Sequence, residues 1–387
     1  MVRALMLLPV ATLLACNGGD PEEVVAGCRD GSPNPDTTRY GVVAHPYDAD
    51  ANQADLWEVV SLDPGGAISR TEQNFHMGRA ALGTVAFTSD GSLGFAVHDD
   101  GTIGVFGLDE TGTSTVVHPG WDDEDALYAV SLTLHPGGER AWVLDEGTIE
   151  QGGGIYEVAI DCTDGTLANL GRIVEATHPS HLLSVGDGDH HVLLGEDVLD
   201  SSAGEHAHLL DTEGPTRLGS TSMWPDDEAI VGGAAVTGDG AYVLAGDFNM
   251  FSGLPNRVAV VRVQPDGVEG LQVLSPIEDP VSIATWGRSA LVVSGTGDAL
   301  VALDHDPNNS EAPFSIGGPL AYTGAAPLLP SSATVVAGPS GGGWILVAEL
   351  SSIRTVQSRS DGSLVDQGVF QFGSGFENMV GAMGMQP

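Results

Sequence analysis

The sequence predicts an all-β protein: a seven-bladed β-propeller with four antiparallel strands in each blade. Short apolar segments recur at intervals of 46–51 residues along most of the 387-residue chain. β-Branched and aliphatic runs are bounded throughout by Gly, Asp and Pro, which favour turns. After the N-terminal apolar run, no long segment shows the helical period of about 3.6 residues. Four strands in each unit of about fifty residues, repeated around an axis, are typical of propeller blades.

The units share one order of segments. Each opens with an apolar run such as SHLLSVGDGD, turns at Gly and Asp, and continues into a second β-rich run such as AYVLAGDF. A third run tends to end in Asp, as in TIGVFGLD and GIYEVAID, and a more variable fourth segment completes the unit. We therefore expect the first strands to begin near Gly83, Ala129, Ser180, Val231, Pro280, Ser331 and Val380.

The two ends of the repeat region are incomplete in complementary ways. The body begins at Arg39 with a second run, RYGVVAHP, which has no first run before it. The C-terminal NMVGAMGMQP looks like a first run with nothing after it. Closing the ring would remove two exposed sheet edges. We therefore expect residues 378–386 to pair with residues 39–46 and to complete the seventh blade.

The N-terminus has the features of a targeting segment. Residues 4–15 form an apolar run too short to cross a bilayer as a helix, and Leu13-Leu14-Ala15-Cys16 ends it. This ending resembles the lipobox of bacterial lipoproteins, which implies cleavage before Cys16 and lipidation of that cysteine. The alternative is an ordinary secretory signal peptide.

These features divide the chain into three parts. We expect a lipoprotein signal peptide over residues 1–15, a lipidated cysteine with a flexible tether over residues 16–37, and the propeller over residues 38–387. The tether is rich in Gly, Pro, Asp and Glu. The protein would then be anchored by lipid to a bacterial membrane, in the periplasm or exposed at the surface. An oxidising envelope permits a disulfide between Cys28 and Cys162, and two separate thiols are the alternative.

The charge of the chain limits its partners. All 13 basic residues are arginine, and 53 acidic residues bring the formal net charge to −40. Such a surface repels phosphate backbones and anionic lipid head groups. We therefore expect no nucleic-acid partner. We also expect membrane contact only through the lipid anchor, because no other segment has transmembrane length, and we expect a monomer.

Two long stretches resemble a known group of propellers. The units GTVAFTSDGSLGFAVHDDGTIGVFGLD and VGGAAVTGDGAYVLAGDF resemble the seven-bladed propellers of the lactonase-like and YVTN families. The resemblance covers nearly all of residues 39–387, and it concerns the fold, not an activity. It implies a family of sugar-lactone hydrolases together with surface or periplasmic proteins that have no assigned chemistry.

In propellers of this kind, ligands usually bind on the face that carries two sets of loops. These loops join the fourth strand to the next blade, and the second strand to the third. Two of them, GWDDEDAL and MWPDDEAI, share a tryptophan followed by acidic residues and lie about two repeats apart. The alternative is an acidic rim whose tryptophans pack against a neighbouring blade. The candidate ligand-binding residues on this face are His76, Arg79, Trp121, Asp122, Asp123, His178, His181, Trp224, Asp226 and Asp227.

No catalytic or metal-binding constellation is complete in the sequence. Asp48 and Asp50 open a calcium-like loop that lacks its glycine, and His206 and His208 with Glu196 make an incomplete zinc set. We therefore predict no catalytic residue, no metal site and no cofactor, and calcium is the open alternative.

The predicted function is an envelope-anchored binding or scaffolding module. Its acidic loop face would hold a protein or a small polar ligand. One alternative is a lactonase-like hydrolase at the mouth of the central channel, with a histidine or carboxylate base near Arg79. The other alternative is a calcium-stabilised structural protein of the surface.

Overall fold

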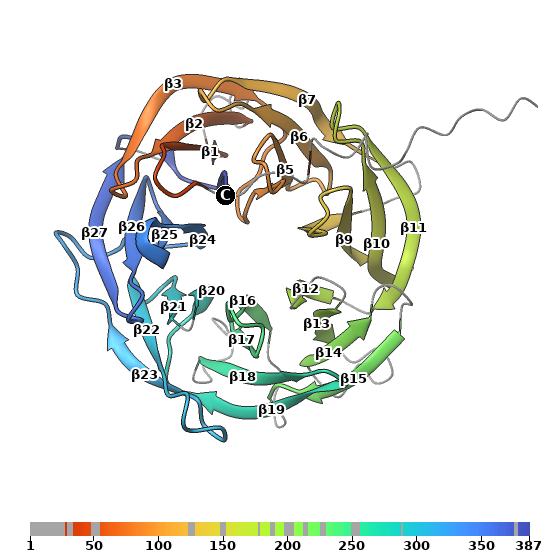
Figure 1. Ribbon diagram of the computed structural model, residues 1–387, viewed down its shortest axis with the longest axis vertical. Coiled ribbons are helices and arrows are strands. Elements are labelled where there is room, and N and C mark those ends of the chain that lie inside the picture. Colours follow the sequence, from red (N-terminus) through yellow and green to blue (C-terminus); the bar gives the residue numbers. More distant parts are fainter. Residues whose placement is uncertain are drawn as a thin grey trace, which may run out of the picture.

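The computed structural model is a ring of seven four-stranded antiparallel sheets around a central axis (Figure 1). The predicted seven-bladed propeller is therefore confirmed. In the part of the chain that the structure describes, no helix is long and apolar enough to span a membrane. The structure describes residues 28, 34–47, 55–122, 128–147, 152–176, 179–185, 190–196, 205–211, 216–224, 230–248, 256–287, 289–374 and 378–387.

Each blade contains four strands, named here from the innermost to the outermost. Blade 1 consists of β28 (Met383–Met385), β1 (Arg39–His45), β2 (Leu56–Leu62) and β3 (Ile68–His76). Blade 2 consists of β4 (Ala86–Phe87), β5 (Leu93–Val97), β6 (Ile103–Leu108) and β7 (Ser114–Trp121). Blade 3 consists of β8 (Ala129–Leu134), β9 (Arg140–Gly147), β10 (Gly152–Ile160) and β11 (Leu167–Ala176). Blade 4 consists of β12 (Pro179–Val185), β13 (His190–Glu196), β14 (Glu205–Asp211) and β15 (Thr216–Ser222). Blade 5 consists of β16 (Val231–Val236), β17 (Tyr242–Asp247), β18 (Arg257–Gln264) and β19 (Gly267–Leu274). Blade 6 consists of β20 (Pro280–Trp286), β21 (Ser289–Ser294), β22 (Ala299–His305) and β23 (Phe314–Pro319). Blade 7 consists of β24 (Ser332–Ala337), β25 (Gly343–Glu349), β26 (Ser352–Ser358) and β27 (Leu364–Gln371).

The C-terminal strand closes the ring. β28 pairs with β1, with Met383 opposite Val43 and Met385 opposite Gly41, as the sequence predicts. The side chain of Gln386 secures the joint, because its amide nitrogen donates to the carbonyls of Gly91 and Leu108, at 2.8 and 2.9 Å. The ends of the chain therefore complete blade 1 and also hold it against blade 2.

The hydrophobic core lies between the blades. The cluster between blades 2 and 3, for example, contains Val105, Val143 and Val158, all fully buried. Burying one such side chain contributes about 1.5–3 kcal/mol relative to leaving it exposed. The innermost strands approach closely: a Cβ on Gly233 of β16 would lie 2.3 Å from the Cα of Ser282 on β20. Glycine is therefore required where blades 5 and 6 meet the axis.

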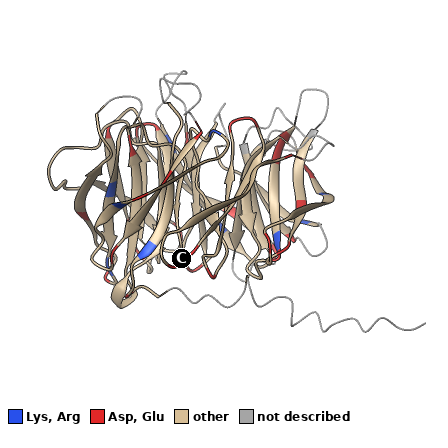
Figure 2. Ribbon diagram, turned by 90° about the horizontal axis from the view of Figure 1, so that it is seen from above, with Lys and Arg blue, Asp and Glu red and all other residues tan. Residues whose placement is uncertain are grey.

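The loops lie on two opposite faces, which we call upper and lower. The lower face carries the C-terminal end of the chain and lies at the bottom of Figure 2. It collects the loops between the first and second strands and between the third and fourth strands. The upper face collects the other two sets. The ligand-binding face expected from the sequence is therefore the upper one.

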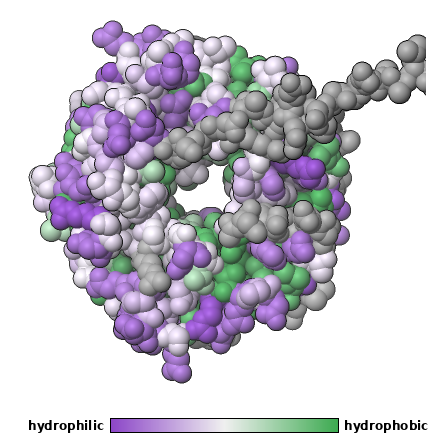
Figure 3. Space-filling model, viewed as in Figure 1, coloured by the Kyte–Doolittle hydropathy of each residue, from purple (hydrophilic) through white to green (hydrophobic). Residues whose placement is uncertain are grey.

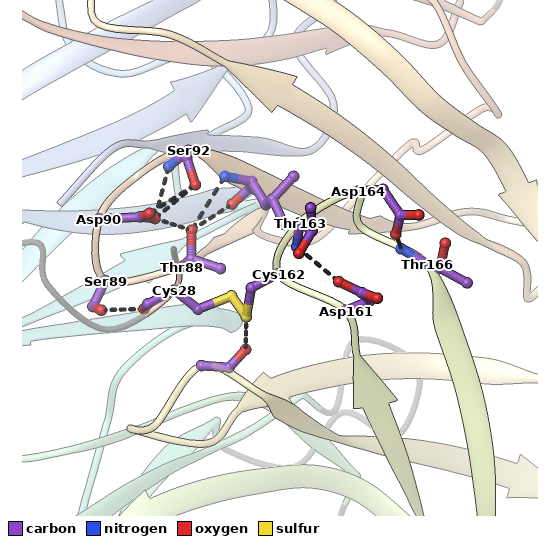
Figure 4. Close-up of a disulfide and its surroundings, with 12 residues drawn as sticks. Cys28, Thr88, Ser89, Asp90, Ser92, Asp161, Cys162, Thr163, Asp164 and Thr166 are labelled. Carbon is purple, nitrogen blue, oxygen red and sulfur yellow. Dashed lines mark hydrogen bonds between the residues drawn. A yellow bond between two sulfur atoms is a disulfide. The ribbon is translucent and has the colours of Figure 1, made fainter. Parts of the chain in front are cut away.

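A disulfide fastens the N-terminal tether to the lower face (Figure 4). Cys28 is bonded to Cys162 in the β10–β11 loop, with 5.5 Å between their Cα atoms. The hydroxyl of Ser89, from the β4–β5 loop of blade 2, donates to the carbonyl of Cys28 at 2.7 Å. Of the two states that the sequence leaves open, the structure contains the bonded one.

Aspartates of the lower face hold their own turns. The carboxylate of Asp90 accepts the backbone N–H of Ser92 at 3.0 Å, and Asp161 does the same for Thr163 at 2.8 Å (Figure 4). Asp109 accepts the N–H groups of Thr111 and Thr113. Short polar side chains stabilise turns in this way because they satisfy backbone donors that face away from the sheet.

Candidate functional site

Five residues on the upper face of blades 1–3 form one exposed cluster, which we call the upper patch. They are Tyr47 after β1, Arg79 and Leu82 in the β3–β4 loop, Asp99 in the β5–β6 loop, and Tyr128 directly before β8. Leu82 is 65% exposed, Tyr128 46% and Tyr47 38%. Large apolar side chains with such exposure, gathered on one surface, make this surface a candidate binding site.

Contacts join four of the five members of the upper patch. The guanidinium of Arg79 lies 5.2 Å from the ring centroid of Tyr47, and its Nε lies 3.1 Å from Oδ2 of Asp99. The hydroxyl of Tyr128 donates to the carbonyl of Asp99 at 2.8 Å. Oδ1 of Asp99 accepts the N–H of Ala81, also at 2.8 Å. Three blades therefore contribute to one surface, in which the guanidinium of Arg79 is paired with the carboxylate of Asp99.

Buried groups support this surface from below. The indole Nε1–H of Trp57 donates to the carbonyl of Gly78 at 3.0 Å, and this contact fixes the β3–β4 loop. His98 is 3% exposed, and its Nδ1 lies 2.9 Å from the hydroxyl of Thr102. Burial lowers the pKa of His98, although the carboxylates of Asp100 and Asp99 oppose this effect. The imidazole is therefore neutral at pH 7 and acts as a structural group.

His76 lies apart from the upper patch, at the outer end of β3. Its Nδ1 is 2.9 Å from Oδ1 of Asp55, and both side chains are about half exposed. An ion pair with this exposure contributes little, because water screens it. Of the predicted pair His76 and Arg79, only Arg79 belongs to the exposed cluster.

The two matched tryptophans are packing residues. Trp224 is 1% exposed and lies among Val231, Val243 and Ala259, in the cluster between blades 4 and 5. Trp121, at the end of β7, packs against the cluster that joins blades 2 and 3. The shared pattern therefore places each indole against the following blade, which is the alternative stated for these loops. Of the candidate residues, Asp123, His178, Asp226 and Asp227 lie outside the described residues, whereas Asp122 follows β7 on the upper face.

His181 lies on the innermost strand of blade 4, in the wall of the central channel. It is part-exposed, and among the residues described no group accepts from or donates to its buried Nδ1. Burial lowers the pKa of His181 to about 4, so the imidazole is neutral at pH 7. A neutral imidazole can accept a proton or donate a hydrogen bond.

Carboxylates are not confined to the upper face. Acidic residues, red in the ribbon, occur towards both faces of the ring (Figure 2), and several on the lower face hold turns. The negative charge of the described residues is therefore shared between the two faces. The reason is that the same Asp-capped turn recurs on the lower face of several blades, for instance at Asp90, Asp109, Asp161, Asp239, Asp306 and Asp361.

Across the ranges that the structure describes, no group of three or more His, Cys, Asp or Glu is arranged to hold a metal ion. The rings of His206 and His208 stack on β14, 5.9 Å apart. Asp48 and Asp50 lie outside the described residues.

Arg79 and His181 are among the candidates that the sequence offers, whereas Tyr47, Leu82 and Tyr128 are not. A signal for Tyr128 was present, because this residue stands directly before the first run of its unit. A large ring at that position must lie at the inner end of an upper loop. No comparable signal brings Tyr47 to Arg79, because β2, β3 and their loops separate them in sequence.

Comparison with known proteins supports the fold alone. No family model matches the chain, and no curated protein matches its sequence. A periplasmic gluconolactonase of Pseudomonas aeruginosa has a similar structure, with a TM-score of 0.63 and 15% identity over 90% of this chain and 99% of that one. A putative 6-phosphogluconolactonase of Bacteroides fragilis has a TM-score of 0.60 and 13% identity, over 92% and 99% of the two chains. A protein of Lactobacillus plantarum has a TM-score of 0.60 and 10% identity, over 90% and 99%.

These similarities define the class of this protein as a seven-bladed propeller with lactonase-like structural neighbours.

Proposed function

We propose that this protein is an envelope-anchored binding module that holds a partner protein on the upper patch. The observation that carries the proposal is the cluster in which Tyr47, Leu82 and Tyr128 remain exposed around Arg79, whose charge is paired with that of Asp99. Aromatic residues and arginine carry much of the binding energy at protein interfaces, and preorganised side chains lose little entropy on binding.

The position of the disulfide supports this role. Cys28 is attached to the lower face, opposite the upper patch. With a lipid on Cys16, the intervening segment would span at most about 40 Å when fully extended. The lower face would therefore lie near the membrane, and the upper patch would be directed away from it.

A photo-cross-linking amino acid at position 82 tests the proposal in intact cells. We expect one discrete adduct with a partner protein, and we expect it to weaken in an Arg79→Ala background, because the patch loses its central contacts. Leu170 on the outermost strand β11 is the matched control, since it is 55% exposed and does not belong to the upper patch. The proposal fails if position 82 gives no adduct, or if position 170 gives the same one.

The anchor has its own test. Labelled palmitate should enter the wild-type protein and should be absent from the Cys16→Ser variant. Equal incorporation in both, or none in either, would remove the anchor and leave the upper patch to be judged by cross-linking alone.

A lactonase-like hydrolase is the second candidate. It is supported by the likeness to gluconolactonases and by the neutral imidazole of His181 in the channel wall. In such a reaction, water would add to the lactone carbonyl, His181 would accept the proton of that water, and the ring C–O bond would break with the proton passing to the ring oxygen.

Turnover of glucono-δ-lactone above its spontaneous hydrolysis tests this candidate. An active enzyme should lose about 10²–10⁴-fold in kcat on His181→Ala, the range expected for a general base. A His118→Ala variant, altered on the outermost strand β7, should retain full activity. A rate equal to that of the buffer would exclude the candidate.

A further inference from the structure

The β23–β24 loop, residues 320–331, is an uncharged segment of the upper face that joins blade 6 to blade 7. It lies within residues 312–348, which contain no Asp, Glu, Lys or Arg, although charged residues make up 17% of the chain. Two adjacent side chains of the loop, Leu328 and Leu329, are 52% and 49% exposed. The loop therefore presents an apolar surface on a protein whose formal charge is −40.

Backbone contacts hold the two leucines in this exposed position. The carbonyl of Leu328 accepts the N–H of Leu350 at 2.9 Å. The N–H of Leu329 donates to Oδ1 of Asp298, in the β21–β22 loop of blade 6, at 2.7 Å. Leu329 has a φ of 45°, in the left-handed region that side chains other than glycine occupy only with strain. Because this leucine is half exposed, burial of its side chain does not offset the strain, and such strain is typical of binding sites.

A buried ionic network fastens the first half of the same loop. Arg354 on β26 is 1% exposed, and its nitrogens lie 2.5 Å from Oε1 of Glu349 and 2.8 Å from Oδ2 of Asp366. Arg354 also donates to the carbonyl of Ala325 at 2.9 Å. The carboxylate of Asp366 accepts the N–H of Thr323. The loop is therefore attached to blade 7 along both of its halves.

Backbone hydrogen bonds connect this loop with the part of blade 1 that carries the upper patch. The carbonyl of Leu350 accepts the N–H of Val380 at 3.2 Å. The next N–H, of Gly381, donates to Ala44 at 2.9 Å, three residues before Tyr47. The leucine pair stands shortly before β24, the innermost strand of blade 7, and thus beside the axial opening, which Figure 3 shows from the lower face. The two apolar surfaces therefore lie on adjacent blades of one face.

The charge around these surfaces is negative. Among the residues that the structure describes in the upper loops, Arg79 is the single cation, and it is paired with Asp99. The exposed and part-exposed carboxylates of the same loops belong to Asp55, Asp99, Asp100, Asp122, Glu278 and Asp298. Such a face attracts a cationic molecule and repels an anionic one.

We propose that the partner of the upper face is a basic protein segment whose large apolar side chains pack on Leu328 and Leu329. This inference rests on the proposed binding function and specifies the chemistry of the partner. Burial of the two leucines would supply hydrophobic binding energy. Lysine or arginine side chains beside them would meet the carboxylates of the surrounding loops, which accelerates association and aligns the partner. A second copy of this chain does not fit, because two molecules of charge −40 repel each other.

Three short synthetic peptides of equal length test this chemistry on the purified protein. One alternates Leu and Lys, the second replaces each Leu by Ser, and the third replaces each Lys by Glu. Fluorescence anisotropy of the labelled peptides measures their affinity. We expect the Leu–Lys peptide to bind at least about tenfold more tightly than the Ser–Lys peptide, because only the first can bury the leucine pair. The Leu–Glu peptide should not bind.

Variants of the leucine pair separate this surface from general attraction of cations to an acidic protein. The Leu328→Ser, Leu329→Ser double variant should bind the Leu–Lys peptide about tenfold more weakly and the Ser–Lys peptide as the wild type does. Leu329→Gly should also weaken Leu–Lys binding, although glycine adopts a φ of 45° without strain, so the loss does not come from a disturbed loop. Leu170→Ser, on the outermost strand β11, is the matched control and should bind normally.

Melting curves identify any variant that has not folded. The proposal is overturned if the Ser–Lys or the Leu–Glu peptide binds as tightly as the Leu–Lys peptide, or if the folded double variant binds the Leu–Lys peptide normally.

Cross-linking in intact cells distinguishes this inference from the proposed function on which it rests. A photo-cross-linking amino acid at position 328 should give the same adduct as one at position 82. The partner segment, sequenced by mass spectrometry, should contain more Lys and Arg than Asp and Glu. An adduct at position 82 without one at position 328, or an acidic segment, overturns the inference and leaves the upper patch as a binding site. An adduct at position 328 alone overturns the upper patch, and no adduct at either position overturns both.

Discussion

Several aspartates of the lower face stabilise the turns in which they stand. Hydrogen bonds from Thr111 and Thr113 hold the pKa of Asp109 below its ordinary value, and a bond from Ser363 does the same for Asp361. Such carboxylates are ionised at pH 7 because their turns use the charged form. Part of the charge of −40 is therefore a by-product of turn chemistry repeated around the ring.

The contacts of Gln386 lead to a prediction about the closure of the ring. Its amide nitrogen donates to Gly91 and Leu108, and its Oε1 accepts the N–H of Tyr40 at 3.2 Å. Gln386→Ala should lower the free energy of unfolding by about 1–3 kcal/mol, because these backbone groups lose their partner. Gln367→Ala, on the outermost strand β27, should change it by less than about 0.5 kcal/mol. Urea denaturation measures both, and equal effects would refute a special role for Gln386.

The burial of His191 leads to a second prediction, which concerns the stability of the protein at acid pH. It is fully buried against Trp142, with a ring separation of 4.0 Å, and its Nε2 lies 3.1 Å from the hydroxyl of Ser184. Burial first, and then the charges of His135 and His190, lower the pKa of His191 to about 4. Because the folded pKa is depressed, the unfolded chain binds the proton first as the pH falls.

The contribution of His191 to stability is therefore complete above about pH 6.5 and is lost as the pH falls towards 4. The loss amounts to about 3 kcal/mol. His191→Gln should remove this part of the pH dependence of unfolding measured between pH 7 and pH 4.5. Gln367→Ala, on the outermost strand β27, should leave the slope unchanged, and the interpretation is wrong if His191→Gln also keeps the wild-type slope.

At the scale of elements, each outermost strand carries a bulge. The register between the third and fourth strands shifts in all seven blades. Gly171, Gly318 and Gly368 have φ values of 110°, 104° and 106° beside three of these shifts. A bulge increases the twist of the strand locally, and glycine allows this conformation without strain. The outer strands can therefore follow the wide rim of the ring.

The disulfide makes an element-scale prediction. It links Cys28 to a residue 134 positions away. The bond closes a long loop and therefore restricts the conformations of the unfolded chain as well. The Cys28→Ser, Cys162→Ser double variant should lose about 2–4 kcal/mol of stability, because the unfolded chain regains that freedom. Denaturation with and without reductant measures the loss. This account would be contradicted if reductant left the stability of the wild-type protein unchanged although a thiol assay showed that both cysteines were reduced.

At the scale of the whole molecule, negative charge repels itself over the surface. Raising the salt concentration from 0.05 to about 1 M shortens the screening length from more than 10 Å to about 3 Å. The melting temperature should rise over this range with chloride as the anion, because the folded state is relieved of its self-repulsion. A flat or falling curve would show that ion pairs outweigh repulsion in this fold.

Much of this molecule was predictable from local patterns. Seven units, the four-strand order and the pairing of β28 with β1 follow from a repeat period and from turn residues, which act on neighbours in sequence. The candidate site was predicted only in part. Arg79 and His181 stand on loops or strands that the repeat identifies, whereas the packing role of Trp121 and Trp224 depends on the following blade.

The sequence by itself determined the class of fold, the closure of the ring and the strong negative charge. The tertiary structure alone decided three things: that Cys28 meets Cys162, that Tyr47, Arg79 and Tyr128 from three blades form one patch, and that seven uncharged strands surround the channel. The physical reason is the range of the interactions. Strand and turn preferences act over a few residues, but a binding surface on a propeller is assembled from loops that only the packing of blades brings together.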